Sequence, residues 1–238
     1  MRSLKVILMM GMALIISSCA YDKIERIPIT PSLVKMDFGQ PFPFEAGLLI
    51  TEQTRGQVFQ SKKVPDILTQ YFYYVLEPYQ LPVGQALEEV SLQIFSNIFQ
   101  KIHLIRTLEE GNKYPLIIEP KLLDFDYHLI YSTIPSHLAY QVVIDGRSEA
   151  KASLSLTARD RSIWENSYKT PVMFRRWFDD YLLRKNMGDQ TWETLTLALE
   201  ELAYRMLEET RKPQTAKGWL EELNLKGPNP ASPQEMKK

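Results

Sequence analysis

Apolar residues recur every three or four positions in two stretches of the chain, a spacing that predicts two amphipathic helices. The first helix follows Pro82, a residue suited to the first helical position. The second runs from about Gln190 to Thr210, with Asp189 or Thr191 as its cap, and Pro213 ends it. The two apolar stripes are Val83, Leu87, Val90, Ile94 and Ile98, and Trp192, Leu195, Leu199, Leu202 and Met206.

Apolar and polar residues alternate in other stretches, which is typical of strands with one buried face. Strands are predicted at residues 102–106, 116–131, 140–144, 150–158 and 162–169, and a hairpin at 46–51 and 57–60 around Arg55-Gly56. In the 116–131 strand, Leu123, Phe125, Tyr127, Leu129 and Tyr131 share one face. These elements predict an α+β fold: a two-layer sandwich with a mostly antiparallel sheet and two long amphipathic helices on one face.

The amino terminus carries a different apolar pattern. Arg2 and Lys5 precede an apolar run from Val6 to Ile16, which is too short to cross a bilayer core of about 30 Å. Ser17 and Ser18 supply the small residues that a signal peptidase needs beside its cut. Together with Cys19, the only cysteine of the chain, this segment resembles the lipobox of bacterial lipoproteins.

The resemblance implies removal of residues 1–18 and covalent attachment of diacylglyceryl and acyl groups, such as palmitate, at Cys19. Several acyl chains give stable anchoring, whereas one chain does not. Ala20 follows the cysteine, and sorting rules retain lipoproteins in the inner membrane mainly when Asp stands there. We therefore expect the inner leaflet of the outer membrane, facing the periplasm. In a cell with one membrane, the same signal places the protein outside it.

The expected organisation has four parts. Residues 1–18 form the signal peptide, and residues 19–45, with four prolines, form the lipidated amino terminus and an extended tether. Residues 46–212 form the α+β domain. Residues 213–238 form a peptide that cannot bury enough apolar surface to fold alone, so we expect it to be largely disordered.

Charge and motifs exclude several functions. The net charge of −1 gives no electrostatic footprint for nucleic acid, and no second apolar stretch predicts a membrane span. Familiar nucleophile, phosphate-loop and zinc-protease motifs are absent from the sequence, so we expect no enzyme and no cofactor beyond the lipid on Cys19. An alternative is a metal-assisted hydrolase, because Asp124, Asp126 and His128 alternate on one strand face and could approach a divalent metal. The same pattern fits an ordinary solvent-facing edge.

Two aromatic segments are candidate contact surfaces. Phe174, Trp177, Phe178 and Tyr181 fall on one face if their segment is helical, with charged residues opposite. Such a helix can lie at a membrane interface, dock in the groove of a partner, or cover the end of the sheet. The run 71–75 is a buried strand or a platform for sugar rings, and the second favours a carrier or sensor of lipid or glycan.

The Leu81–Leu87 stretch that opens a helix and the Ile163-Trp164-Glu165 strand, together with the lipobox, resemble small periplasm-facing outer-membrane lipoproteins. The families are the YajG-type lipoproteins, the lipoprotein of the lipopolysaccharide translocon, and others similar to the amino-terminal domain of TolB. The resemblance implies a non-catalytic binding or assembly module, an accessory factor of an outer-membrane machine. It implies an envelope protein partner, besides the membrane that holds the lipid. The sequence does not set the oligomeric state.

Overall fold

A computed structural model describes residues 24–33, 37–61, 78–135, 140–158, 161–178 and 182–212. The fold is α+β, as predicted, and strands predominate in it. The described strands and helices are β1 (Glu25–Arg26), β2 (Phe42–Leu49), α2 (Glu52–Arg55), β3 (Phe59–Gln60), β4 (Tyr79–Leu81), α4 (Val83–Ser96), β5 (Phe99–Ile105), α5 (Leu108–Gly111), β6 (Ile117–Pro135), β7 (Tyr140–Ala158), β8 (Arg161–Lys169), β9 (Met173–Trp177) and α6 (Leu183–Arg211).

The chain divides into two compact units. Residues 1–26 and 60–80 belong to the first, whose described part is small: β1 pairs in parallel with β4, and the Tyr79 amide donates to the Ser61 hydroxyl over 2.9 Å. Residues 27–59 and 81–238 belong to the second unit. This second unit holds the main sheet, both longer helices and the residues considered below.

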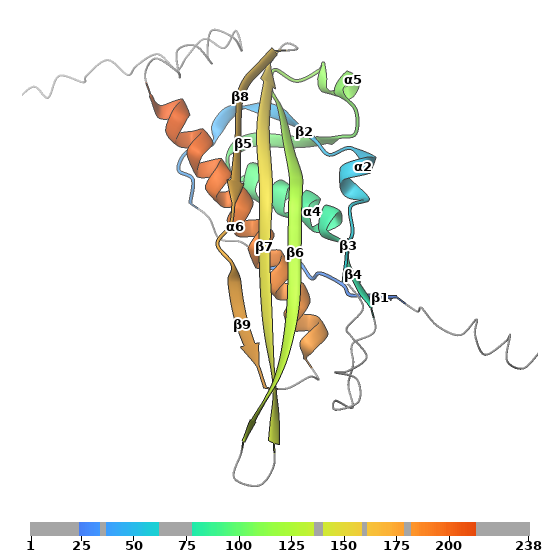
Figure 1. Ribbon diagram of the computed structural model, residues 1–238. Coiled ribbons are helices and arrows are strands. Elements are labelled where there is room, and N and C mark those ends of the chain that lie inside the picture. The colour runs from blue at the N-terminus through green and yellow to red at the C-terminus, as the bar shows by residue number, and fades with distance from the viewer. Residues whose placement is uncertain are drawn as a thin grey trace, which may run out of the picture. The chain divides into compact units, whose positions relative to one another are not determined.

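The main sheet has the strand order β5-β2-β6-β7-β8, and β9 also pairs with β7. β2 pairs in parallel with both β5 and β6, whereas β7 is antiparallel to β6, β8 and β9. The sheet is therefore mixed, and the expectation of a mostly antiparallel sheet is corrected at its β5-β2-β6 side. Figure 1 shows β6 and β7 as two long strands side by side, with β8 and β9 following one another along β7.

The hairpin predicted around Arg55-Gly56 is wrong. The Thr51 hydroxyl accepts a hydrogen bond from the Thr54 amide over 3.1 Å and so caps the short helix α2, which ends at Gly56. A capped helical turn follows β2 in place of a hairpin turn, because threonine at this position satisfies a free amide of the first turn. The neighbours of β2 then come from farther along the chain.

Helix α4 lies where the sequence predicts it. Its buried residues recur at helical spacing, from Val83 and Leu87 to Val90 and Ile94. Gly84 is required at its first turn, because a Cβ there would lie 2.1 Å from the carbonyl oxygen of Thr54. The Gly84 amide also donates to the Gln57 carbonyl over 3.0 Å. The absent side chain thus lets α2 pack against the start of α4.

Helix α6 is longer than predicted and has 29 residues, against 14 in α4, so the expectation of two long helices is wrong. It begins seven residues before Gln190, and the predicted caps Asp189 and Thr191 lie inside it. Its first half buries Gln190, Thr191 and Thr194 completely. The prediction missed residues 183–189, although Leu183 and Met187 are buried there. Asn186, Gly188 and Asp189 are residue types typical of helix ends, so the pattern indicated a helix that begins after them. α6 packs against α4, β7, β8 and β9.

β7 is one strand of 19 residues, so the predicted strands 140–144 and 150–158 are a single element. The face toward α6 carries Gly146, Ser148, Ala150 and Ala152, all buried. Such small side chains allow a helix to approach a sheet closely. A Cβ on Gly146 would lie 2.2 Å from the Trp177 ring and 2.6 Å from the Gln190 side-chain oxygen.

A bulge in β6 changes the face that its side chains occupy. Leu122 pairs with Ala152 and Asp124 pairs with Lys151, so Leu123 has no partner in the ladder and is 52 % exposed. Leu122 takes the buried position instead. The predicted face is therefore wrong at Leu123, because one extra residue reverses the alternation.

The domain begins earlier than predicted. Ile27 is fully buried and Phe38 is 6 % exposed, with the Phe38 ring 5.1 Å from that of Tyr204. Residues 27–33 and 37–45, expected in an extended tether, are therefore part of the compact unit, and its boundary moves from 46 to Ile27. The predicted signal peptide 1–18, the lipidation residue Cys19 and the peptide 213–238 lie outside the described residues.

Gly146→Ala should destabilise the protein. The added methyl group overlaps the Trp177 ring and the Gln190 amide, and overpacking of this kind costs about 1–3 kcal/mol. Urea denaturation followed by circular dichroism measures the loss. In a Trp177→Leu background the same substitution should cost less, because the ring is gone. An equal cost in both backgrounds would contradict the steric explanation.

Candidate contact face

The segment from Val172 to Phe178 is a strand with its flanking residues and not the predicted helix. Side chains alternate along it: Val172, Phe174, Arg176 and Phe178 are exposed, whereas Trp177 is half-buried. Val172, Phe174 and Phe178 are 56 %, 51 % and 55 % exposed. The period of two separates Trp177 from the two phenylalanines, so the predicted single aromatic stripe does not exist. Tyr181, the fourth predicted contact residue, lies outside the described residues.

The neighbouring strand β7 adds a carboxylate and a guanidinium to the exposed side of this segment. Arg147 pairs with Phe174 and Asp145 pairs with Arg176 in the register of β7 and β9. Directly paired residues of antiparallel strands project on the same side of the sheet. The resulting surface, called here the β9 face, consists of Asp145, Arg147, Val172, Phe174, Arg176 and Phe178.

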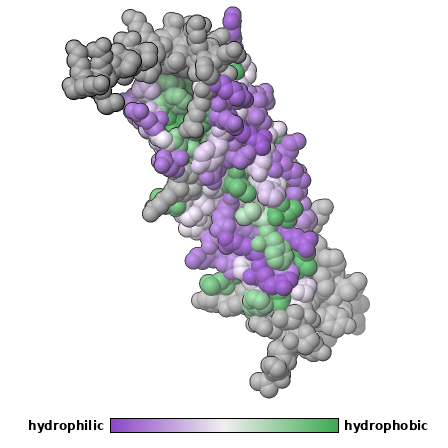
Figure 2. Space-filling model, turned by 90° about the vertical axis from the view of Figure 1, so that its left-hand side faces the viewer, coloured by the Kyte–Doolittle hydropathy of each residue, from purple (hydrophilic) through white to green (hydrophobic). Residues whose placement is uncertain are grey.

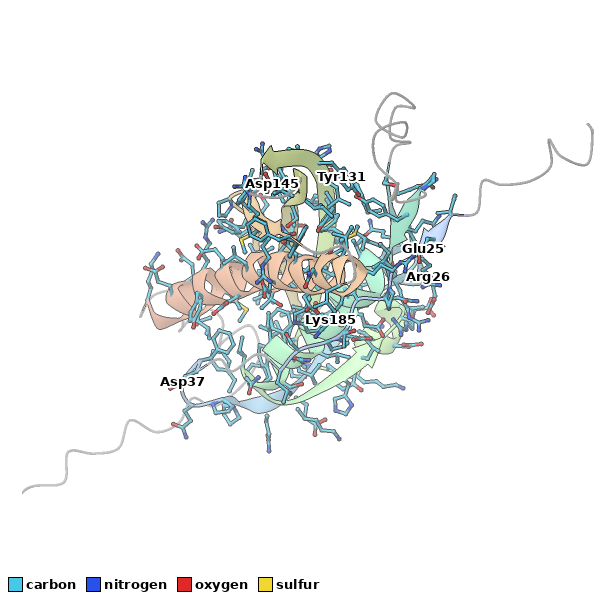
Figure 3. All side chains as sticks on the ribbon, turned by 90° about the horizontal axis from the view of Figure 1, so that it is seen from below. Glu25, Arg26, Asp37, Tyr131, Asp145 and Lys185 are labelled. Atoms are coloured by element: carbon cyan, nitrogen blue, oxygen red, sulfur yellow. The ribbon has the colours of Figure 1, made fainter. Side chains whose placement is uncertain are left out.

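Two views show this part of the molecule. Figure 2 shows the side on which β8 and β9 lie, and apolar residues gather among hydrophilic ones in its lower half. In the view from below, Asp145 and Tyr131 lie on the same side of α6, in the sheet layer (Figure 3). Gly146 and Ser148 of β7 contact α6, so the alternating Asp145 and Arg147 put the β9 face on the side of the sheet turned away from α6.

Charge on the β9 face is organised around Asp145. The Arg176 guanidinium donates two hydrogen bonds to its carboxylate, of 2.7 and 2.9 Å. The hydrogen bond from Arg176 and the charges of Arg176 and Arg147 lower the pKa of Asp145 against the opposing effect of its burial. The same bond raises the pKa of Arg176. Asp145 is thus neutralised by one arginine, and the charge of Arg147 remains as an excess within the face.

The two arginines also flank an aromatic ring. The guanidinium carbons of Arg147 and Arg176 lie 5.9 and 5.7 Å from the centre of the Phe174 ring. These distances fit cation–π attraction, which holds the exposed ring between two cations. Chemically, the face presents apolar side chains and guanidinium donors, a combination suited to binding an anionic, partly apolar surface.

The inner side of β9 fixes the strand on the helix. Arg175 forms an ion pair with Glu193 of α6, at 2.5 Å. The Gln190 amide donates to the carbonyls of Met173 and Gly146, over 3.0 and 3.2 Å. These contacts set the position of β9, and they are why Phe174 and Phe178 project outward.

Asp124, Asp126 and His128 do not form a three-ligand site. The Asp126 carboxylate lies 2.7 Å from the His128 imidazole, and the bulge lies between Leu122 and Asp124. Lys169 donates to Glu149 over 2.9 Å, and its pKa is raised first by that bond and further by the charges of Glu149, Asp124 and Asp126. Among the residues that the structure describes, no three His, Cys, Asp or Glu side chains are grouped so as to hold a metal ion.

Two other polar clusters have structural partners. His103, isolated in the sequence, lies 2.5 Å from the Glu45 carboxylate and stacks on the Tyr114 ring with centres 4.7 Å apart. Arg106, the residue after β5, binds the Glu88 carboxylate of α4 through two bonds of 2.5 and 3.1 Å. Neither pairing could be predicted from the sequence, because each joins residues on different elements.

The remaining candidates are placed as follows. The aromatic run 71–75 and residues 213–238 lie outside the described residues. No helix in the described ranges combines the length and the apolar character needed to cross a membrane. Arg147, Val172 and Arg176 of the β9 face were not among the predicted candidate residues. A two-residue period applied to 172–178 would have found Val172 and Arg176.

The sequence matches no known family model and no curated protein. Among solved structures, it is similar to a Xanthomonas campestris protein of the DUF330 family, with 8 % identity, a TM-score of 0.42 and coverage of 82 % of this chain and 97 % of that one. It is also similar to a putative neuraminyllactose-binding hemagglutinin homolog from Helicobacter pylori, with 9 % identity, a TM-score of 0.39 and coverage of 80 % and 96 %. At these scores neither likeness bears on function.

The ion pair of Asp145 predicts a pH dependence of stability. Because its pKa is lowered in the folded state, the pair stabilises the fold above the ordinary value of 3.8, and this contribution is lost as the pH falls through the lowered pKa. Asp145→Asn should be less stable than the wild type at pH 7, and the difference should close below about pH 4. Urea titrations across that range measure it, with Asp124→Asn as the exposed control. A constant difference would contradict the prediction.

Proposed function

We propose that the chain is a lipid-anchored, non-catalytic binding module of the bacterial envelope, an accessory factor that holds a protein partner close to the membrane. The observation that carries the proposal is the position of Cys19, the candidate lipidation residue, only eight residues before the fully buried Ile27. The lipid then holds a compact unit at the membrane and not a body on a long tether.

The contrast between bonded polar side chains inside the unit and exposed apolar side chains on the β9 face supports a binding role. Inside the unit, the Gln190 side chain of α6 accepts a hydrogen bond from Tyr127 of β6, and the Thr194 hydroxyl is hydrogen-bonded to that of Ser148 in β7. Arg106 binds the Glu88 carboxylate of α4. These groups connect helices to strands. The β9 face, in contrast, leaves three apolar side chains half exposed to solvent, which is typical of a contact surface.

The proposal also includes an assembly role and a location in the outer membrane. The resemblance to YajG-type lipoproteins, to the lipopolysaccharide-translocon lipoprotein and to the amino-terminal fold of TolB favours an assembly role. Ala20 favours the inner leaflet of the outer membrane, with the domain in the periplasm.

Pull-down tests the partner. The full chain is expressed from its own signal, solubilised from envelopes in mild detergent and captured through a carboxyl-terminal tag. Chemical cross-linking before solubilisation retains weak complexes. Enrichment of a specific envelope protein is expected, and the matched control is an unrelated lipoprotein with the same tag. Failure to enrich any envelope protein, with and without cross-linking, would contradict the binding role.

Cys19→Ser should abolish acylation. The serine hydroxyl cannot take the thioether-linked diacylglyceryl group, so metabolic labelling with palmitate should give signal only in the wild-type protein. Mass spectrometry of the wild-type protein should show a chain that begins at Cys19 and carries fatty acids. An intact Met1 start, or an unmodified thiol at Cys19, would refute the anchoring.

Ala20→Asp should move the protein between membranes. In a cell with two membranes, Asp after the lipidated cysteine retains the lipoprotein in the inner membrane, so the variant should shift from outer-membrane to inner-membrane fractions on a density gradient. Ala20→Ser is the matched control and should stay with the outer membrane. Co-fractionation of the wild type with the inner membrane would overturn the outer-membrane assignment.

A further inference from the structure

Strand β9 lies at a margin of the main sheet. It pairs with β7 on one side, and among the described residues no strand pairs with its other side, called here the open edge of β9. Figure 1 shows β9 at the outer margin of the sheet, with α6 crossing behind the sheet. The backbone groups of an edge strand that do not bond their neighbour can pair with a further strand.

The contacts of Gln190 show which backbone groups of β9 point to the open edge. Its amide nitrogen donates to the carbonyls of both Gly146 and Met173. Two carbonyls that reach one nitrogen cannot point to opposite sides of neighbouring strands, so both lie between β7 and β9. Since Gly146 pairs with Arg175, the odd-numbered residues of β9 bond β7. The even-numbered residues therefore direct their amides and carbonyls to the open edge, because the two kinds alternate along an antiparallel strand.

The same even-numbered positions carry the exposed side chains. Phe174 and Arg176 are exposed, and so are the flanking residues Val172 and Phe178. Natural edge strands are commonly protected by charged side chains, by prolines or by a covering loop. Three of these four positions are apolar, so within 172–178 the open edge has little of the usual protection against a further strand.

The segment 172–178 is complementary to itself in one antiparallel register. When Arg175 lies opposite the Arg175 of a second copy, Val172 lies opposite Phe178, which is an apolar pair. Phe174 then lies opposite Arg176, whose guanidinium already lies 5.7 Å from the Phe174 ring of its own chain. Because both of these residues direct their backbone groups to the open edge, this register also joins the two strands by hydrogen bonds.

The inner side of the segment also matches in this register. Met173 lies opposite Trp177 of the second copy, and contacts between methionine sulfur and aromatic rings are favourable. The two Arg175 side chains lie opposite each other, and unpaired like charges there would repel. Each Arg175 forms an ion pair with Glu193 of its own chain, so two cations and two carboxylates come together.

We propose that the open edges of β9 from two copies of this chain pair in antiparallel fashion about a two-fold axis at Arg175, which extends the main sheet across a symmetric dimer. The same surface is used on both copies, so the assembly closes at two chains. This pairing goes beyond the proposed function, because it depends neither on the lipid of Cys19 nor on an envelope partner. Such a partner then binds the dimer on another surface.

The size of the interface determines the experiment. Only residues 172–178 of each copy pair, whereas a standard protein interface uses roughly 20–30 residues from each side. The dimer should therefore be weak and reversible, and covalent trapping is the suitable measurement.

Disulfide trapping tests the register. Arg175→Cys places a cysteine opposite itself, and opposed residues outside hydrogen-bonded pairs have Cα atoms about 4.5 Å apart, within the range of a disulfide. Lys101→Cys on β5, at the other edge of the sheet, is the matched control, and the wild type gives the background from Cys19. The full chains are expressed from their own signal, oxidised in intact envelopes, and analysed on non-reducing gels and by mass spectrometry.

Arg175→Cys should form a disulfide-linked dimer severalfold more than Lys101→Cys or the wild type. Adding Phe174→Pro should reduce the dimer severalfold, because proline removes an amide that points to the open edge and leaves the bonds to β7. Adding Val172→Lys should also reduce it, because a charge replaces half of an apolar pair. Circular dichroism of both variants should match that of the wild type.

Three results would overturn the pairing. The first is an Arg175→Cys dimer no more abundant than that of Lys101→Cys, which would leave the acylation and pull-down results of the proposed function intact. The second is a dimer that neither Phe174→Pro nor Val172→Lys reduces, because the contact then lies elsewhere. The third is a disulfide from Arg175→Cys to a different protein, which assigns the open edge to that protein.

Discussion

The side chain of Gln190 joins four elements of the fold, and the arrangement of β9 depends on it. Its oxygen accepts a hydrogen bond from the Tyr127 hydroxyl over 2.9 Å, and its amide donates to the carbonyls of Gly146 and Met173. The side chain is fully buried, and both its oxygen and its nitrogen are bonded. A buried amide left unbonded costs about 1–3 kcal/mol, so the network tolerates only a narrow range of positions for α6 relative to β6, β7 and β9.

The narrow range of positions open to α6 explains which side chains of β9 are exposed. Gly146 leaves the space that the Trp177 ring and the Gln190 amide occupy, and Arg175 binds Glu193 on the same side. With the odd-numbered residues of β9 held against α6, the even-numbered ones must project outward, since a strand alternates. Phe174 is thus exposed because the interior contacts are made by its neighbours. Arg147 and Arg176 then lie on both sides of it.

The sequence predicts the elements whose burial is apolar and regular. Helix α4 and strand β8 fall within a few residues of their predicted bounds, as does the buried alanine and leucine ladder of β7. Three kinds of feature could not be predicted from the pattern of apolar and polar residues. Residues typical of helix ends, Asn186, Gly188 and Asp189, hid the first seven residues of α6. One bulged residue at Leu123 reversed a face, and the parallel pairing of β2 joins segments far apart in the chain. In the predicted contact segment, a helical period was applied to residues that form the strand β9.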